Sequence, residues 1–299
     1  MSEDDIKALA TRTRPSVAAA PGLDVTVLRR RRRRGEWRHT LFGIFILAVM
    51  LFPVYWMLNV SLQPSGSAVG TPWLPLDMNL AGYAKALHEQ GGNLLTSLIV
   101  AVGSVVFSLL VAAPGAYALA RFKVRGAAVV LLGILISQMI PGIVVANALY
   151  SAYNDMGLLN SIPGLILADS TAGIPFAMLI LYTFMKSIPL SIVEAAWVDG
   201  AGPMRTFVSV VMPMSRNALV TAALFTFLFT WGDFLFALTL TTTPDVRPVT
   251  LGLYTYIGTY VNDWSSVMAT AVLASLPAVV LLVLAQRYVA AGMTSGAVK

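Results

Sequence analysis

Two carboxylates inside long apolar stretches are the residues of this sequence best placed to do chemistry. Asp169 lies in the apolar run that begins at Ile162, and Asp233 lies in the run that ends at Leu240. Because an ionised carboxylate that faces lipid is costly, both side chains should face a protein interior or a wet cavity. Carboxylates that accept hydrogen bonds from hydroxyls, with aromatic faces nearby, typically hold a sugar. The same groups could instead relay protons or fasten neighbouring helices together.

One side of a helix drawn around Asp233 is small and polar. At about 100° per residue, Thr226, Phe229 and Thr230 fall on the same side as Asp233, while most of the bulky apolar side chains fall on the other. At about 1.5 Å per residue, Asp169 and Asp233 reach a similar depth, roughly 10 Å below one membrane surface. The two carboxylates are therefore expected to share one layer. The residues expected to line a substrate pathway are Thr226, Phe229, Thr230, Asp233 and Asp169.

A short helical hairpin between two apolar segments is the second candidate element. Ser191 and Glu194 have the spacing of a capping box, in which each side chain bonds the backbone N–H of the other residue. Gly200 ends this helix by accepting a left-handed conformation, and Pro203 suits the first turn of the next helix. The two alanines after Glu194 lack bulk. The hairpin therefore offers a smooth face that another protein can approach closely.

The composition places the chain in the membrane class. Hydrophobic residues make up 57% and charged residues 11%, and the mean hydropathy is +0.76, values far from those of a soluble domain. The lack of Cys excludes disulfides and thiol nucleophiles, and the isolated His39 and His88 predict no metal site. No G-x-x-x-x-G-K-[ST] phosphate loop occurs, so any driving energy should come from a partner or an ion gradient. We expect no catalytic residue and no cofactor in this chain.

Six apolar segments are long enough to cross a membrane as helices. Each has about 20 residues or more, which at ~1.5 Å per residue covers a hydrocarbon core of ~30 Å. Aromatic residues alternate between Phe225 and Trp231 as in a strand, but an open strand cannot satisfy its backbone in lipid. We therefore expect an all-α membrane protein of six transmembrane helices. The segments are residues 41–62, 94–120, 127–150, 162–185, 218–240 and 267–286. The prolines expected to kink them are Pro53, Pro114, Pro141, Pro175 and Pro277.

The distribution of basic residues predicts the orientation. With the amino terminus inside, all of the 20 Lys and Arg residues except Lys85 and Arg247 fall on the cytoplasmic side. Both termini and the hairpin are then cytoplasmic. Residues 1–37 form a basic tail whose run from Arg29 to Arg34 sits on anionic lipid headgroups. Nucleic-acid binding is disfavoured because the run directly precedes a membrane segment and lacks a folded basic domain. The outer loops are expected at residues 63–93, 151–161 and 241–266.

The hairpin carries a resemblance to a known family. Glu194-Ala195-Ala196-Trp197-Val198-Asp199-Gly200-Ala201, followed by Val210-Val211-Met212-Pro213, resembles the E-A-A-x-x-x-G and I-x-L-P signature of binding-protein-dependent ABC importer permeases. Val210 and Met212 replace the usual Ile and Leu, which are mild changes of volume. Residues 116–122, 157–160 and 292–299 resemble the carbohydrate branch, and specifically the six-helix subunit that pairs with a second permease in maltose-type systems.

The resemblance implies a type I ABC importer permease fold for residues 38–299. It also implies that residues 190–216, here named the coupling element, dock in a groove of a separate ATPase subunit that binds ATP and Mg. Pro213 should disturb the second helix of this element. The carboxyl-terminal tail that ends at Lys299 could also reach the ATPases. The residues that the resemblance assigns to ATPase coupling are Glu194, Ala195, Ala196, Asp199, Gly200 and Pro213.

The function implied is uptake of a carbohydrate through the inner membrane of a bacterium or archaeon. The carbohydrate expected is an oligosaccharide or a glycoside. The implied partners are a second permease subunit, two ATPase subunits, an extracytoplasmic sugar-binding protein and membrane lipid. An ion-coupled secondary transporter that uses Asp169 and Asp233 as proton carriers is an alternative hypothesis. A purely structural membrane subunit is another.

Overall fold

The computed structural model describes residues 25–64, 70–258 and 263–295, and the side chains of residues 37–64, 70–256 and 263–286. The chain divides into two units, residues 1–55 and residues 56–299. The described part of the first unit belongs to one helix, α2 (Val25–Ser61), which begins well before the apolar segment expected at residue 41. Within the expected basic tail, residues 1–24 and the side chains of residues 25–36, which include the arginine run, fall outside the described residues, and so do residues 296–299.

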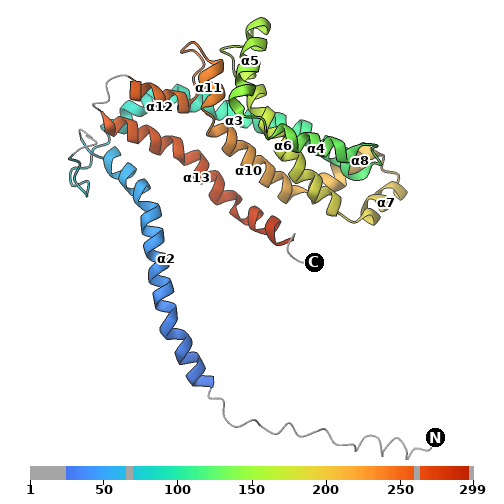
Figure 1. Ribbon diagram of the computed structural model, residues 1–299, viewed down its shortest axis with the longest axis horizontal. Helices are drawn as coiled ribbons and strands as arrows, with labels where there is room; N and C mark the ends of the chain where they lie inside the picture. Colours follow the sequence, from blue (N-terminus) through green and yellow to red (C-terminus); the bar gives the residue numbers. More distant parts are fainter. Residues whose placement is uncertain (1–24, 65–69, 259–262, 296–299) are drawn as a thin grey trace, which may run out of the picture. The chain divides into compact units, whose positions relative to one another are not determined.

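Every element of the described chain is helical, as the sequence predicts (Figure 1). The second unit contains a long α3, two bent pairs of shorter helices and a long α13. In chain order its elements are α3 (Ala81–Arg121), α4 (Ala127–Ser137), α5 (Gly142–Met156), α6 (Ile162–Ser187), α7 (Leu190–Val198), α8 (Pro203–Thr206), the π-helical turn η1 (Phe207–Val211), α9 (Met212–Met214), α10 (Arg216–Trp231), α11 (Leu235–Leu240), α12 (Val249–Gly258) and α13 (Trp264–Ser295).

The centre of the second unit is the crossing of α3, α6 and α10. Gly173 of α6 makes this crossing possible, because a Cβ atom there would lie 2.6 Å from the Ser108 Oγ and 2.9 Å from the Thr226 Cγ2. Small residues at a helix interface let membrane helices approach closely, and in lipid such packing drives their association. Figure 1 shows α7 and α8 at one end of this crossing and α5, α11 and α12 at the opposite end.

Among the described residues, four helices are long and apolar enough to cross a membrane without interruption. Up to six crossings result if each bent pair of helices counts as one span, α4 with α5 and the segment Pro203–Met214 with α10. The four uninterrupted helices are Trp37–Ser61, Ala81–Arg121, Ile162–Ser187 and Trp264–Gln286.

The third expected span is not one helix. The axis bends by 94° between α4 and α5, and Pro141 caps α5 with an extended backbone of φ −58° and ψ 131°. Proline fixes φ and disfavours a helical conformation at the residue before it, which explains the break. The other prolines expected to kink spans, Pro53, Pro114, Pro175 and Pro277, all lie inside continuous helices.

The fifth expected span, residues 218–240, is also interrupted. α10 ends at Trp231 and α11 begins at Leu235, so the prediction of one continuous helix with a polar stripe is wrong beyond Trp231. The cause is local. Gly232 is a poor helix former, and the Asp233 carboxylate accepts backbone N–H groups that a continuous helix would use.

All three expected outer loops contain helical residues, and in the loop predicted at residues 151–161 these are the last residues of α5, which ends at Met156. The loop predicted at residues 63–93 is helical from Ala81, and the loop predicted at residues 241–266 contains α12. Contacts across the sequence hold these segments. The Lys85 Nζ lies 2.9 Å from the Asp263 Oδ2 at the start of α13, and the Tyr256 hydroxyl of α12 donates to the Glu89 Oε2 at 2.8 Å. Such pairings are invisible to a local reading of the sequence.

Gly173→Ala should destabilise the bundle, because its Cβ would overlap the Ser108 side chain. We expect a loss of about 1–3 kcal/mol, typical of overpacking, measured as a lower midpoint of thermal unfolding in detergent. Gly133→Ala is the matched control, since a Cβ on this α4 glycine meets nothing within 4 Å. That control should be neutral or stabilising by up to about 1 kcal/mol. Equal stability of the two variants would contradict the close crossing.

Candidate functional site

The first helix of the coupling element starts differently from the prediction. α7 begins at Leu190, Pro189 occupies the N-cap position with φ −54° and ψ 135°, and no side chain caps the helix. The expected capping box of Ser191 and Glu194 is therefore wrong. Because Pro189 holds an extended backbone immediately before Leu190, Ser191 lies inside the first turn and cannot serve as the cap.

The turn between α7 and α8 follows the prediction. Gly200 has φ +79°, a left-handed conformation that residues with a Cβ resist. Two backbone hydrogen bonds close the helix end, from Gly200 N to Trp197 O at 3.0 Å and from Ala201 N to Ala196 O at 2.9 Å. Pro203 is the first residue of α8, as expected.

The second half of the hairpin is irregular before Pro213. α8 passes into the π-helical turn η1 (Phe207–Val211), where the backbone N–H of Met212 bonds the carbonyl of Phe207. Pro213 then lies in the three-residue α9. A proline has no N–H to donate, and a widened turn is one way for a helix to accommodate the missing bond. The prediction that Pro213 disturbs this helix is confirmed.

The coupling element has a buried side and an exposed side. Val193, Phe207 and Val211 are buried in one apolar cluster. On the exposed side, Val198 is 88% and Met204 71% accessible, and both are large apolar side chains. These two apolar side chains are open to contact with another molecule. The residues assigned to ATPase coupling lie on the exposed side or between the two sides: Glu194, Ala195, Asp199, Gly200 and Pro213 are exposed, and Ala196 is half-buried.

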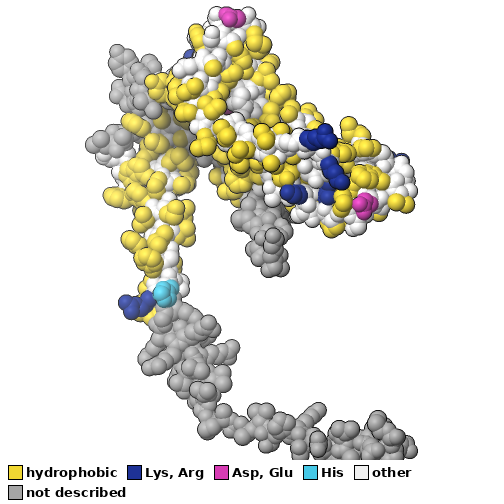
Figure 2. All heavy atoms as spheres, turned by 45° about the vertical axis from the view of Figure 1, so that its right-hand side comes forward, with side chains coloured by type: hydrophobic (Ala, Val, Ile, Leu, Met, Phe, Trp, Pro, Cys, Tyr) yellow, Lys and Arg dark blue, Asp and Glu magenta, His cyan; other side chains and the backbone are white. Residues whose placement is uncertain are grey.

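The surface around the coupling element is basic. Figure 2 shows hydrophobic side chains over most of the visible bundle, while Lys and Arg gather toward the end that carries α7 and α8 in Figure 1. The exposed basic residues that the chain places near its helix ends in this region are Lys123, Arg125, Lys186, Arg205 and Arg216.

Asp233 stabilises the break in the fifth span. Its carboxylate accepts the backbone N–H of Ala237 at 3.1 Å through Oδ2 and that of Phe236 at 3.4 Å through Oδ1, which caps α11. A carboxylate at a helix N-terminus also interacts favourably with the helix dipole. The Asp233 carbonyl in turn accepts the Thr250 hydroxyl at 2.6 Å. Asp233 therefore has a structural role in this conformation.

Asp169 and Asp233 line one small cavity. Asp169 is only 7% exposed, and in the described part of the chain no hydrogen bond reaches its carboxylate. The cavity has a volume of about 10 Å³, enough for roughly one water molecule. Its lining residues are Ser97, Val100, Leu165, Asp169, Thr230, Asp233, Ala237 and Pro248. Among the described residues, no three His, Asp or Glu side chains gather to hold a metal ion.

The structure separates the other two residues expected on the polar stripe from this cavity. The Thr226 side chain is buried against Gly173. Phe229 is 54% exposed, and its ring meets the ring of Phe176 edge-on at 5.4 Å. Thr226 is buried in the bundle and Phe229 is exposed, so the two side chains do not lie on one face of α10. The polar stripe predicted from the sequence therefore includes residues from more than one face of the helix.

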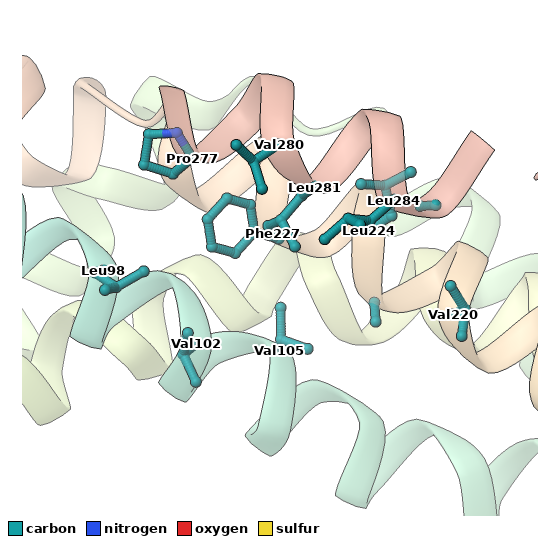
Figure 3. Close-up of a pocket in the computed structure, with 12 residues that line it drawn as sticks. Leu98, Val102, Val105, Val220, Leu224, Phe227, Pro277, Val280, Leu281 and Leu284 are labelled. Atoms are coloured by element: carbon teal, nitrogen blue, oxygen red, sulfur yellow. The ribbon is translucent and has the colours of Figure 1, made fainter. Parts of the chain in front are cut away.

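A larger cavity of about 510 Å³ lies between α3, α10 and α13. In Figure 3, Phe227 of α10 points toward Val280 and Leu281 of α13, above Val102 and Val105 of α3. Every side chain that lines it is apolar, so it cannot hydrogen-bond a sugar. The lining residues are Leu98, Val102, Val105, Val220, Ala223, Leu224, Phe227, Pro277, Val280, Leu281, Leu284 and Ala285.

Two polar residues that were not among the predicted site residues stabilise irregular segments of the backbone. Asn160, in the left-handed region at φ 54°, accepts the N–H groups of Thr242 at 2.6 Å and Thr243 at 2.9 Å through its side-chain oxygen. Arg121 at the end of α3 donates to the carbonyls of Met185 and Ile188. The available signal was their place inside the short stretches at residues 116–122 and 157–160 that carry the family resemblance.

Comparison with known proteins relates the whole bundle to one family. Residues 104–295 match the family described as "Binding-protein-dependent transport system inner membrane component". The chain is similar to the trehalose transport system permease protein SugB of Mycobacterium tuberculosis, with 30% identity over 272 residues, covering 90% of this chain and 98% of that protein. It is 31% identical over 274 residues to the diacetylchitobiose uptake system permease protein DasC of Streptomyces coelicolor, covering 88% and 99% of the two chains.

Solved structures agree with this relationship. A chain of a bacterial ABC transporter involved in the import of the acidic polysaccharide alginate has a TM-score of 0.73 and 25% identity, covering 86% of this chain and 96% of that one. A chain of the MetNI methionine ABC transporter, at a TM-score of 0.56 and 18% identity, covers 70% of this chain and 98% of that one and shares the fold. The protein is therefore a multi-pass inner-membrane protein of a prokaryote, and ATP hydrolysis lies in partner subunits rather than in this chain. The chain belongs to the family of inner-membrane permease components of binding-protein-dependent ABC importers.

Proposed function

We propose that this chain forms one half of the membrane pathway of an ABC importer for an oligosaccharide or a glycoside. Its relatives support this cargo. They are named for trehalose and for diacetylchitobiose, and a protein of Agrobacterium fabrum that is 30% identical is named for sulfoquinovosyl glycerol. Each of these compounds contains a glycosidic bond. A periplasmic binding protein delivers the cargo, and ATPase subunits drive its uptake.

The observation that carries the proposal is the two-sided coupling element. Its buried residues fasten it to the bundle, while Val198 and Met204 project from the opposite side. An ATPase subunit that covers this side buries their apolar area. Closure of a pair of ATPase subunits then pushes the coupling element and tilts the helices between inward-open and outward-open states.

A second permease subunit completes the pathway. The polar cavity around Asp169 and Asp233 has room for roughly one water, and the larger cavity of this chain is apolar. Neither can pass a sugar in this conformation. A pathway between two permease chains resolves this difficulty, because the exposed Phe229 ring can then meet cargo at the shared surface. Thr226, Thr230, Asp169 and Asp233 meet cargo only after the helices tilt.

Both termini and the coupling element face the cytoplasm in this proposal. The support is the bias of Lys and Arg toward that side. Asn160 and the Thr242–Thr243 segment then face the periplasm, where the binding protein docks. Two ATPase subunits bind ATP and Mg on the cytoplasmic side.

Reconstitution tests the function directly. The complete assembly, placed in proteoliposomes with ATP inside and with ionophores that abolish ion gradients, should accumulate a labelled disaccharide such as trehalose or diacetylchitobiose when the cognate binding protein is added outside. Uptake that needs an ion gradient and ignores ATP would contradict the proposal.

The docking surface can be tested with a single cysteine, because the chain contains none. A benzophenone maleimide attached at Val198→Cys should cross-link to an ATPase subunit, since this side chain is exposed on the coupling element. Met156→Cys at the end of α5 is the control, because this side chain is also exposed (67%) but lies outside the coupling element and should not cross-link. In intact cells an impermeant maleimide should label the cysteine at 156 and leave the one at 198 unlabelled. The reverse pattern would refute the orientation.

Gly200→Ala should weaken the coupling element. A side chain in the left-handed conformation costs roughly 1–2 kcal/mol, so the turn should relax and shift the docking surface. The expected result is an ATPase that dissociates from the membrane fraction or hydrolyses ATP without transport, while the permease remains inserted. Gly202→Ala is the matched control, because this neighbouring glycine has φ −68° and open space around it. Wild-type transport by Gly200→Ala would argue against the docking role.

Asp233→Asn separates the charge of this residue from its cap. Asparagine also caps helices well, so α11 should keep its start and the thermal midpoint should stay near the wild-type value. If the charged group meets cargo, the rate of uptake should fall by about tenfold, the loss expected from a polar contact of roughly 1.4 kcal/mol. Asp233→Ala should add a loss of stability of about 1 kcal/mol. Unchanged uptake by Asp233→Asn would leave Asp233 with a packing role only.

A further inference from the structure

The last residue of α3 contacts the entrance to the coupling element. The Arg121 Nη2 donates to the Ile188 carbonyl at 2.7 Å and also to the Met185 carbonyl. Both carbonyls lie at the end of α6, directly before α7. The final carbonyls of a helix have no partner within the helix, and a cation there interacts favourably with the helix dipole. Arg121 therefore holds the point at which the chain leaves α6 for the coupling element.

The same turn of α3 also contacts the second arm of the coupling element. The Tyr117 ring lies 5.0 Å from the ring of Phe207, the first residue of η1. Tyr117 and Phe207 are both buried in the apolar cluster that contains Val193 of α7. The end of α3 is thus attached to the segment that leads into the hairpin, through hydrogen bonds, and to the second arm of the hairpin, through ring packing.

The Arg121 guanidinium binds backbone carbonyls and does not pair with a carboxylate. In the described part of the chain, no carboxylate pairs with Arg121. The ion pair found there joins Lys85, near the start of α3, to Asp263. Its guanidinium is partly buried, and its interactions with protein are hydrogen bonds to two carbonyls that lie three residues apart. Such an arrangement fixes the position of a chain segment, because two acceptors on one helix end define both its distance and its direction.

Pro114 precedes the last turns of α3. Pro114 lies one turn before Tyr117 and has no N–H with which to complete the helical ladder, so the helix is weakened at that point. Beyond Pro114, the last turns of α3 are joined to α6 and to the coupling element by the contacts above. A displacement of the coupling element is then passed to α3 at its weakened turn.

We propose that Arg121 is a positioning residue that fixes the start of the coupling element to the last turn of α3, so that movement of the docked ATPase reaches the membrane helices through this joint. The inference rests on the proposed docking of the coupling element. Arg121 touches neither nucleotide nor cargo in this scheme. It acts by keeping α6, α7 and α3 in one rigid relation.

The test uses the complete reconstituted assembly with Arg121→Gln and Arg121→Lys. The readout is the ratio of ATPase rates with and without the cognate binding protein loaded with a disaccharide. Arg121→Gln should lower this ratio by about tenfold, the equivalent of roughly 1.4 kcal/mol of coupling free energy. Arg121→Lys keeps the charge but lacks the planar guanidinium, so its ratio should fall between those of the wild type and Arg121→Gln. Arg125→Gln, an exposed arginine in the turn after α3, is the matched control and should keep the wild-type ratio.

The cross-link from Val198→Cys to the ATPase distinguishes a failure of the proposed Arg121 joint from a failure of the proposed docking. Loss of the binding-protein response with the cross-link intact supports the joint. A wild-type response in Arg121→Gln overturns it, whatever the docking result. Absence of the cross-link in the otherwise wild-type assembly overturns the docking itself. If Arg121→Gln fails to accumulate in the membrane, Tyr117→Leu serves as the second variant, because it removes the ring contact with Phe207. A lowered ratio of ATPase rates in Tyr117→Leu supports the joint, and an unchanged ratio overturns it.

Discussion

Backbone groups that are freed where a membrane helix ends must find partners inside the protein, because lipid offers none. In this chain a single polar side chain serves each of three such places. Asp233 bonds the N–H groups at the start of α11. Arg121 bonds the carbonyls at the end of α6. Asn160 bonds the N–H groups of the segment after α11. At these three places a side chain holds irregular backbone, whereas the α4–α5 break follows from Pro141 and the α7–α8 turn is closed by backbone hydrogen bonds around Gly200.

These three points divide the bundle into a tight centre and two ends with different roles. At the centre, Gly173 lets α3, α6 and α10 approach closely, so this region transmits force with little deformation. At one end, Arg121 and Tyr117 fasten the coupling element. At the other end, Asn160 joins the α5–α6 turn to the segment between α11 and α12. In the proposed importer, the first end meets the ATPase and the second end meets the binding protein.

Local sequence signals predicted the hairpin well and the ends of helices less well. Gly200 adopts the left-handed conformation and Pro203 begins α8, because both properties belong to the residue itself. The capping box failed because Pro189, and not Ser191, occupies the N-cap position, so α7 begins two residues earlier than a Ser191 cap requires. The continuous fifth span failed because hydropathy alone ignores the effect of a glycine followed by an aspartate. Resemblance to the permease family supplied the partners, which no pattern of periodicity could have identified.

The sequence by itself determined that the chain is a helical membrane protein, and it located the hairpin that carries the family signature. Apolar length, the bias of Lys and Arg, and the conformations of Gly and Pro are properties of short segments, so they can be read without a fold. Only the tertiary structure decided that Asp169 and Asp233 share a cavity, that Phe229 does not line it, and that Arg121 reaches a carbonyl 67 residues further along the chain. These relations depend on the rotation and depth of each helix against its neighbours, and packing between distant segments sets both.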